Sequence, residues 1–133
     1  MKPQIVISAS RRTDIPAFYM DWFMGQIEAG FFELSNPFNG RKTIIPATPD
    51  HVHTIAFWSK DFSRFISGRY GIRLIQMGYH LFFNFTVNSS STLLEPNIPP
   101  LEHRLDQAAS LCETFGPQTV QWRFDPVCCY TIA

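Results

Sequence analysis

Cationic and hydrogen-bonding side chains follow apolar, β-prone segments of this chain, where they could bind an anion. Lys60 and Arg123 each stand near the end of such a segment, and either could hold a carboxylate or a phosphate through charge-assisted hydrogen bonds. Asn84 and Thr86 alternate with apolar residues in a third segment and could add hydrogen bonds to the same ligand. Because a buried cation is costly unless it is paired or contacts a ligand, these residues predict an anion site.

Two aspartates, Asp14 and Asp125, could act together with these cations. In a ligand site, either aspartate would serve as acid, base or orienting group, and the candidate catalytic residues are Asp14, Lys60 and Asp125. The alternative is an internal ion-pair network, in which the aspartates only neutralise Lys60 and Arg123.

Four more polar residues are candidates for ligand binding. Arg11 and Arg12 lie between an expected strand end and a helix start, where free backbone N–H groups favour phosphate, although adjacent arginines are commonly solvated loop charges. Ser10 precedes them on the polar side of the expected strand. Asn36 begins the turn Asn36–Asn39, which either folds over the strand ends or is an ordinary solvated hairpin tip.

The sequence contains no motif that defines a reaction. It has no glycine-rich phosphate loop, nucleophile elbow, zinc-binding helix motif or ferredoxin-like cysteine run. Its cysteines, Cys112, Cys128 and Cys129, do not form a disulfide framework, because adjacent cysteines rarely bridge each other. The pair His51 and His53 is better explained as surface histidines than as ligands, and no metal site is predicted.

The candidate residues depend on four β-prone runs that alternate with helical stretches, a pattern typical of βαβ units and a parallel sheet. These runs are Ile5–Ser10, Thr54–Trp58, Leu81–Val87 and Val120–Phe124. The sequence predicts an α/β fold: a partial (β/α) barrel with about four parallel strands, flanking helices and an inserted β-hairpin. Ligands of such sheets bind at the carboxyl ends of the strands, where the polar residues would converge.

Helix and turn signals lie between these runs. Asp14 is an expected N-cap of a helix that ends at Gly30, and Asp61 is an expected N-cap of a second helix that is weakened by glycines. The expected apolar face of the first helix consists of Phe18, Tyr19, Trp22, Phe23 and Ile27. The Asn39-Gly40 dipeptide predicts a hairpin over about residues 31–48. Pro100 opens a third helix, with Arg104 on its outer face. The expected apolar stripe of this third helix is Leu101, Leu105, Ala108, Cys112 and Phe115.

Composition limits the class of protein and its partners. The 133 residues predict one domain, residues 1–133, and a hydrophobic share of 45% predicts a globular core. Lys plus Arg equals Asp plus Glu at 11 each, so the chain lacks the basic excess that would favour nucleic acid or an anionic membrane. No apolar run approaches the roughly 20 residues of a membrane span, and we expect a cytoplasmic protein with a small anionic ligand.

Several segments together resemble the bacterial domain-of-unknown-function family 1848. They match in order and spacing and are Ser8–Tyr19, Asn36–Asn39, Phe57–Lys60, Glu95–Pro100 and Trp122–Pro126. The resemblance implies a barrel-like fold and a radical S-adenosylmethionine-like enzyme of about twice this length, in keeping with single-domain barrels of roughly 250 residues. It also implies a 4Fe–4S cluster and S-adenosylmethionine, bound by cysteines in the later half of the family.

The tail Val127–Ala133 departs from the continuation that the resemblance implies. Neighbouring cysteines do not supply three spaced thiolates, so no cofactor is expected in this chain, which resembles the amino-terminal half of a barrel enzyme and would be inactive alone. The main hypothesis is a half-barrel that offers an anion-binding face. The alternatives are an autonomous module that binds a small metabolite or nucleotide without catalysis, and a nonfunctional fragment. An open sheet edge predicts a homo-oligomer.

Overall fold

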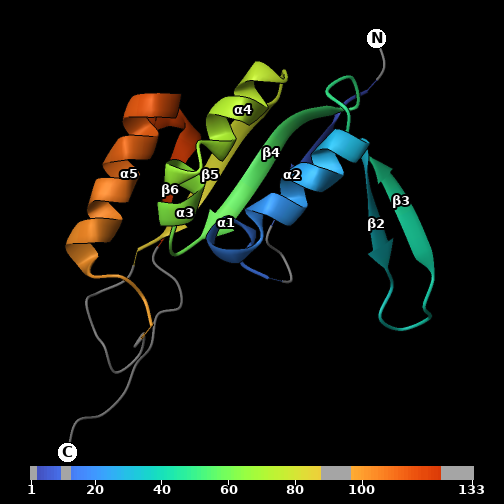
Figure 1. The fold of residues 1–133 in the computed structure, drawn as a ribbon, viewed down its shortest axis with the longest axis horizontal. Helices are drawn as coiled ribbons and strands as arrows, with labels where there is room; N and C mark the ends of the chain where they lie inside the picture. Colours follow the sequence, from blue (N-terminus) through green and yellow to red (C-terminus); the bar gives the residue numbers. More distant parts are fainter. Residues whose placement is uncertain (1–2, 10–12, 88–96, 124–133) are drawn as a thin grey trace, which may run out of the picture.

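The computed structural model describes residues 3–9, 13–87 and 97–123. Four strands form a parallel sheet in the order β1-β4-β5-β6 (Figure 1). Their bounds are Ile5–Ser8 for β1, Val52–Ser59 for β4, His80–Thr86 for β5 and Val120–Arg123 for β6. This arrangement confirms the predicted α/β fold with four parallel strands, and the described strands form an open sheet rather than a closed barrel.

The helices lie between the strands along the chain. They are α1 (Ile15–Phe18), α2 (Met20–Ala29), α3 (Ser63–Ser67), α4 (Tyr70–Gln76) and α5 (Leu101–Phe115), followed by a 3-10 turn (Pro117–Thr119). Because the strand order never reverses, right-handed crossovers bring successive helices to the same face of the sheet. Phe57 and Phe83 of that face pack edge-on against the helix residue Phe65.

Side chains along β5 point alternately to the two faces of the sheet, and the two sets differ in burial. Leu81, Phe83 and Phe85 are buried against the helices, as their spacing predicts. Phe82 and Thr86 point to the other face and are only half-buried. We call this second side the uncovered face, because the described helices pack on the first.

The first helical region differs from its prediction. It breaks at Tyr19 into α1 and α2, and restarting the helix at Met20 changes which residues face the sheet. The buried residues of α2 are Met20, Phe23, Met24 and Ile27, at the spacing of one helix face. Phe18, Tyr19 and Trp22 are exposed, so the predicted aromatic stripe was wrong at these three positions.

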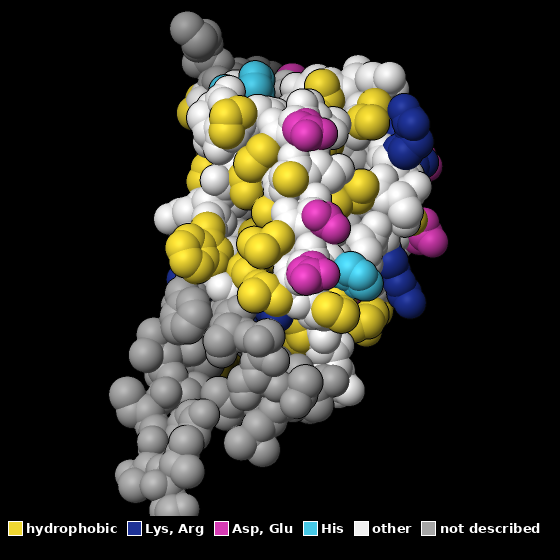
Figure 2. Space-filling view, turned by 90° about the vertical axis from the view of Figure 1, so that its left-hand side faces the viewer, with side chains coloured by type: hydrophobic (Ala, Val, Ile, Leu, Met, Phe, Trp, Pro, Cys, Tyr) yellow, Lys and Arg dark blue, Asp and Glu magenta, His cyan; other side chains and the backbone are white. Residues whose placement is uncertain are grey.

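Helix α5 keeps part of the predicted stripe, since Leu101, Ala108 and Phe115 pack against the core, but its buried face is shifted. Leu105 is 53% exposed and Cys112 is half-buried, whereas Arg104 is 2% exposed and Gln107 and Leu111 are buried. Placing Arg104 on the outer face was therefore wrong. Patterning assigns polar residues to solvent, but Gln107 can be buried because Asp61 and the Phe62 backbone supply its hydrogen bonds. Figure 2 views the molecule from the side on which α5 lies in Figure 1. On that surface, apolar side chains lie beside acidic side chains.

The hairpin forms a separate antiparallel sheet of β2 (Phe31–Ser35) and β3 (Lys42–Pro46), as predicted. Asn36 accepts a hydrogen bond from the Phe38 backbone N–H at 2.8 Å, and Gly40 takes the positive φ of 68° that the turn requires. The hairpin lies beyond the β1 side of the molecule, away from β6 (Figure 1).

Candidate functional site at the strand ends

The carboxyl end of β4 is tied to the start of α1 by Asp14. Asp14 Oδ1 accepts from the Ala17 backbone N–H at 3.1 Å, which caps α1 as the sequence predicts. Its second oxygen, Oδ2, lies 2.9 Å from the Ser59 hydroxyl at the last position of β4. One carboxylate therefore joins two segments that are 45 residues apart in the sequence.

Gln107 extends this network to α5. Its Oε1 accepts from the Phe62 backbone N–H at 2.8 Å, and its Nε2 donates to Asp61 Oδ1 at 3.0 Å. Asp61 Oδ1 also accepts from the Ser63 backbone N–H at the start of α3, but the N-cap of α3 is Phe62, one residue later than the sequence predicts. The buried amide of Gln107 thus provides hydrogen-bond partners for the Phe62 N–H and the Asp61 carboxylate in the turn between β4 and α3.

Burial raises the pKa of Asp14 above its usual value of 3.8. The hydrogen bonds from Ser59 and Ala17 oppose this rise because they stabilise the carboxylate, while the nearby charge of Asp61 adds to it. Both oxygens of Asp14 have partners in the described structure. Its geometry fits a residue that positions the strand end.

The uncovered face carries a second group of polar side chains, in register across three strands. Trp58 is opposite Asn84, and Asn84 is opposite Gln121. Thr86 and Arg123 form the next pair toward the carboxyl ends. The predicted neighbours on β5 and β6 are therefore adjacent, on parallel strands.

Hydrogen-bond donors in this second group lack acceptors within the described part of the chain. The guanidinium of Arg123 lies 4.6 Å from the centre of the Trp58 ring, at cation–π distance. The Trp58 indole Nε1 is buried and has no hydrogen-bond partner in residues 3–9, 13–87 and 97–123. Asn84 is 4% exposed, and no hydrogen bond joins its side chain to another described residue. We call Trp58, Asn84 and Arg123 the donor cluster.

The other predicted site residues are placed as follows. Lys60 is half-buried directly after the end of β4. Asn36 lies in the hairpin, beside the opposite edge of the sheet from Arg123. The remaining candidates lie outside the described residues and are Ser10, Arg11, Arg12 and Asp125.

The structure separates residues that the sequence grouped together. Asp14 bonds to Ser59, which shares the helix-covered side of β4 with Phe57, whereas Trp58 points to the uncovered face. No ion pair between Arg123 and a described carboxylate is present. The aspartate network and the donor cluster are thus two distinct groups at neighbouring strand ends.

Sequence reasoning missed Gln107 and did not count Trp58 as a site residue. Trp58 carried a usable signal, because it alternates with Lys60 and shares its expected strand face. Gln107 carried none, because its partners are about 45 residues earlier in the chain.

The described residues do not fit an iron–sulfur cluster. No group of three His, Cys, Asp or Glu side chains in residues 3–9, 13–87 and 97–123 could hold a metal ion. Cys112 is a free thiol on α5, and Cys128 and Cys129 lie outside the described ranges. No helix in the described segments is long and apolar enough to cross a bilayer.

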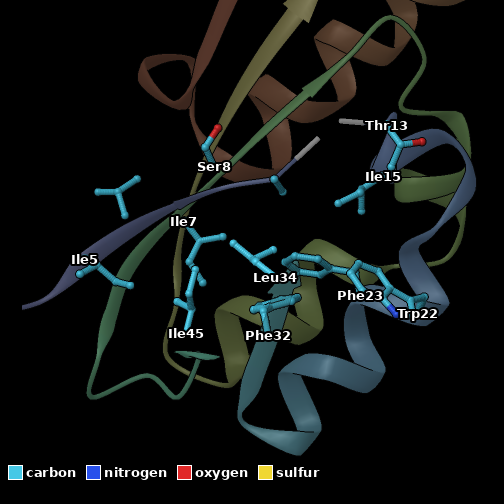
Figure 3. Close-up of a pocket in the computed structure, with 12 residues that line it drawn as sticks. Ile5, Ile7, Ser8, Thr13, Ile15, Trp22, Phe23, Phe32, Leu34 and Ile45 are labelled. Atoms are coloured by element: carbon cyan, nitrogen blue, oxygen red, sulfur yellow. The ribbon is translucent and has the colours of Figure 1, made fainter. Parts of the chain in front are cut away.

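An apolar groove lies at the other edge of the sheet, between β1, α2 and the hairpin (Figure 3). Its volume is about 420 Å³. Its lining is mostly aliphatic and aromatic, with Ser8 and Thr13 as polar members. The groove is distinct from the donor cluster, which lies on β4 to β6.

A protein-family model described as a domain of unknown function, DUF1848, matches residues 6–132. The chain belongs to the DUF1848 family. No curated protein and no solved structure matches this chain. The region shared with the DUF1848 model includes all of α1 to β6, and therefore both the aspartate network and the donor cluster.

Proposed function

We propose that this DUF1848 chain binds a small anionic ligand, bearing a carboxylate or a phosphate, at the donor cluster. The observation that carries the proposal is the buried indole N–H of Trp58, which has no acceptor among the described residues, in a ring that lies beneath the guanidinium of Arg123. A buried donor without a partner costs about 1–3 kcal/mol, and an anionic acceptor in front of Trp58 would recover that energy.

Arg123 is the main anion-binding residue in this proposal. Its guanidinium can hold a carboxylate or a phosphate through two parallel hydrogen bonds, and the Trp58 ring beneath it limits the orientations that it can take. Asn84 contributes an amide one residue pair away, opposite Trp58. Thr86 is directly opposite Arg123 and can donate through its hydroxyl.

The lack of an ion pair between Arg123 and a carboxylate of the described residues supports a ligand over an internal ion-pair network. Of the two aspartates that the sequence offers as partners, Asp125 lies outside the described residues, and the two oxygens of Asp14 accept from Ala17 and Ser59. Lys60 directly follows β4 and would add positive charge at this end of the sheet. We assign Asp14 a positioning role and propose binding without catalysis, as in an autonomous metabolite-binding module.

The test is calorimetric titration of the protein with inorganic phosphate and, separately, with citrate. Replacing Arg123 by Ala should weaken binding by about 1.5–3 kcal/mol, the usual contribution of hydrogen bonds to charged groups, which is at least tenfold in Kd. Trp58→Phe keeps a ring beneath the guanidinium and removes only the indole N–H, so it should weaken binding less than Arg123→Ala does.

Arg64→Ala is the matched control, because Arg64 also lies over an aromatic ring, that of Phe18, at 5.8 Å, but on the helix side. It should leave the Kd unchanged. Equal losses in both arginine variants would show nonspecific charge attraction, and failure of both anions to bind the unmodified protein would refute the proposal. Anaerobic iron–sulfur reconstitution tests the redox chemistry implied by the family resemblance; stoichiometric iron would contradict a binding-only role.

A further inference from the structure

Asn84 differs from the other two members of the donor cluster, because its side chain carries an acceptor as well as donors. Trp58 and Arg123 offer only N–H groups, whereas the amide of Asn84 has an NH2 group and an oxygen. Asn84 is 4% exposed, and its side chain makes no hydrogen bond with another described residue. A buried amide oxygen without a donor costs free energy, so a ligand that donates to Asn84 is favoured over one that only accepts.

This requirement does not depend on which way the Asn84 amide is turned. Both ends of the amide lack partners within the described part of the chain, and one of the two ends is always the oxygen. An anion can accept from the NH2 end, but it has nothing to donate to the oxygen. A ligand that is only an anion would therefore satisfy Trp58, Arg123 and half of Asn84.

The register of the sheet places Asn84 beside the point where Arg123 meets Trp58. Strand β5 lies between β4 and β6, and Trp58 on β4 is opposite Asn84 on β5. Arg123 is on β6, so its guanidinium and the Trp58 ring, 4.6 Å from it, meet across β5. Neighbouring strands are about 4.8 Å apart, so an anionic group held by Arg123 and Trp58 lies roughly one strand spacing from Asn84. A donor on a carbon close to the anionic group could reach the amide oxygen.

The charges around the donor cluster favour a neutral donor over an ammonium group. Arg123 is cationic, and no ion pair joins it to a carboxylate of the described residues. The oxygens of Asp14 accept from Ala17 and Ser59 on the helix-covered side of β4. An ammonium group on the ligand would therefore lie near a like charge with no described carboxylate to offset the repulsion. A hydroxyl donates a hydrogen bond and adds no charge.

We propose that the ligand is a hydroxy carboxylate, whose carboxylate accepts from Arg123 and Trp58 and whose hydroxyl donates to the amide oxygen of Asn84. One guanidinium balances the single charge of a carboxylate, whereas a phosphate group carries about −1.5 to −2 at pH 7. This inference rests on the proposed function and adds the part of the ligand that Asn84 recognises. A site that hydrogen-bonds a hydroxyl discriminates against the analogue without it, because the buried amide is then left unpaired.

The experiment compares citrate with tricarballylate by calorimetric titration, under conditions where all carboxylates are ionised. The two probes have the same three carboxylates and differ only in the hydroxyl of citrate. The unmodified protein should bind citrate at least about tenfold more tightly than tricarballylate. Asn84→Leu removes the amide at similar side-chain size and should bring the ratio of the two Kd values to about one. Gln76→Leu is the matched control, because it makes the same kind of change at an exposed position on α4, and it should keep the ratio.

Arg123→Ala separates the two parts of the site, because it should weaken citrate and tricarballylate by similar factors and leave their ratio unchanged. Equal binding of both probes by the unmodified protein would overturn the hydroxy carboxylate, while the proposed anion binding would stand. A ratio that survives in Asn84→Leu would overturn the role given to Asn84. Inorganic phosphate that binds more tightly than citrate would overturn the choice of a carboxylate. Failure of all three anions to bind would refute the proposed function itself, and this inference with it.

Discussion

Replacing Gln107 by Leu should destabilise the fold by removing the acceptor of one buried N–H group. The Phe62 N–H donates to Gln107 Oε1 at 2.8 Å, and Phe62 is 0% exposed, so no water can replace the lost partner. An unsatisfied buried donor costs about 1–3 kcal/mol. Leu is similar to Gln in size, so no large cavity adds to this cost, and the Asp61 oxygen that loses the Nε2 donor still accepts from Ser63.

The expected loss in the free energy of unfolding is about 2 kcal/mol, which lowers the Tm of a chain of this size by roughly 6–10 °C. Urea unfolding followed by circular dichroism measures it. Gln76→Leu, at an exposed position at the end of α4, should change stability by less than about 0.5 kcal/mol. A Gln107→Leu protein as stable as the Gln76→Leu control would refute the role given to this hydrogen bond.

Two further predictions concern the acid range and two helical glycines. Because burial raises the pKa of Asp14, the folded state binds the Asp14 proton more tightly than the unfolded state does. The stability that protonated Asp14 contributes is therefore fully present below about pH 3.9, the unfolded pKa, and is lost as pH rises through the folded pKa. Asp14→Asn should remove this component, and urea unfolding from pH 3 to 7 should show an altered slope that a surface Asp106→Asn control does not reproduce. Gly71→Ala should destabilise, since the added Cβ would lie 2.5 Å from Phe115 Cζ, whereas Gly25→Ala, with nothing within 4 Å, should stabilise by about 0.5–1 kcal/mol. Thermal unfolding checks both glycine variants, and equal effects would contradict the packing argument.

Local patterns in the sequence were sufficient for the elements of the fold. The alternation in Leu81–Val87 predicted which side of β5 is buried, because successive side chains of a strand point to opposite faces. Asp14 and the Asn39-Gly40 turn were predicted from the backbone geometry that caps and tight turns require. These signals depend on residues within a few positions of each other, which is why a single sequence reveals them.

Contacts between distant segments were decided by the tertiary structure. The rotation of α5, which buries Arg104 and exposes Leu105, depends on how the helix docks on the sheet, and composition along the helix does not encode that docking. The pairing of Gln107 with Phe62 joins residues 45 positions apart. The sequence determined that Trp58 and Arg123 lie near the ends of strands. Only strand order and register placed the Arg123 guanidinium 4.6 Å from the centre of the Trp58 ring. The reason is that the distance between side chains across a sheet depends on which strands are neighbours.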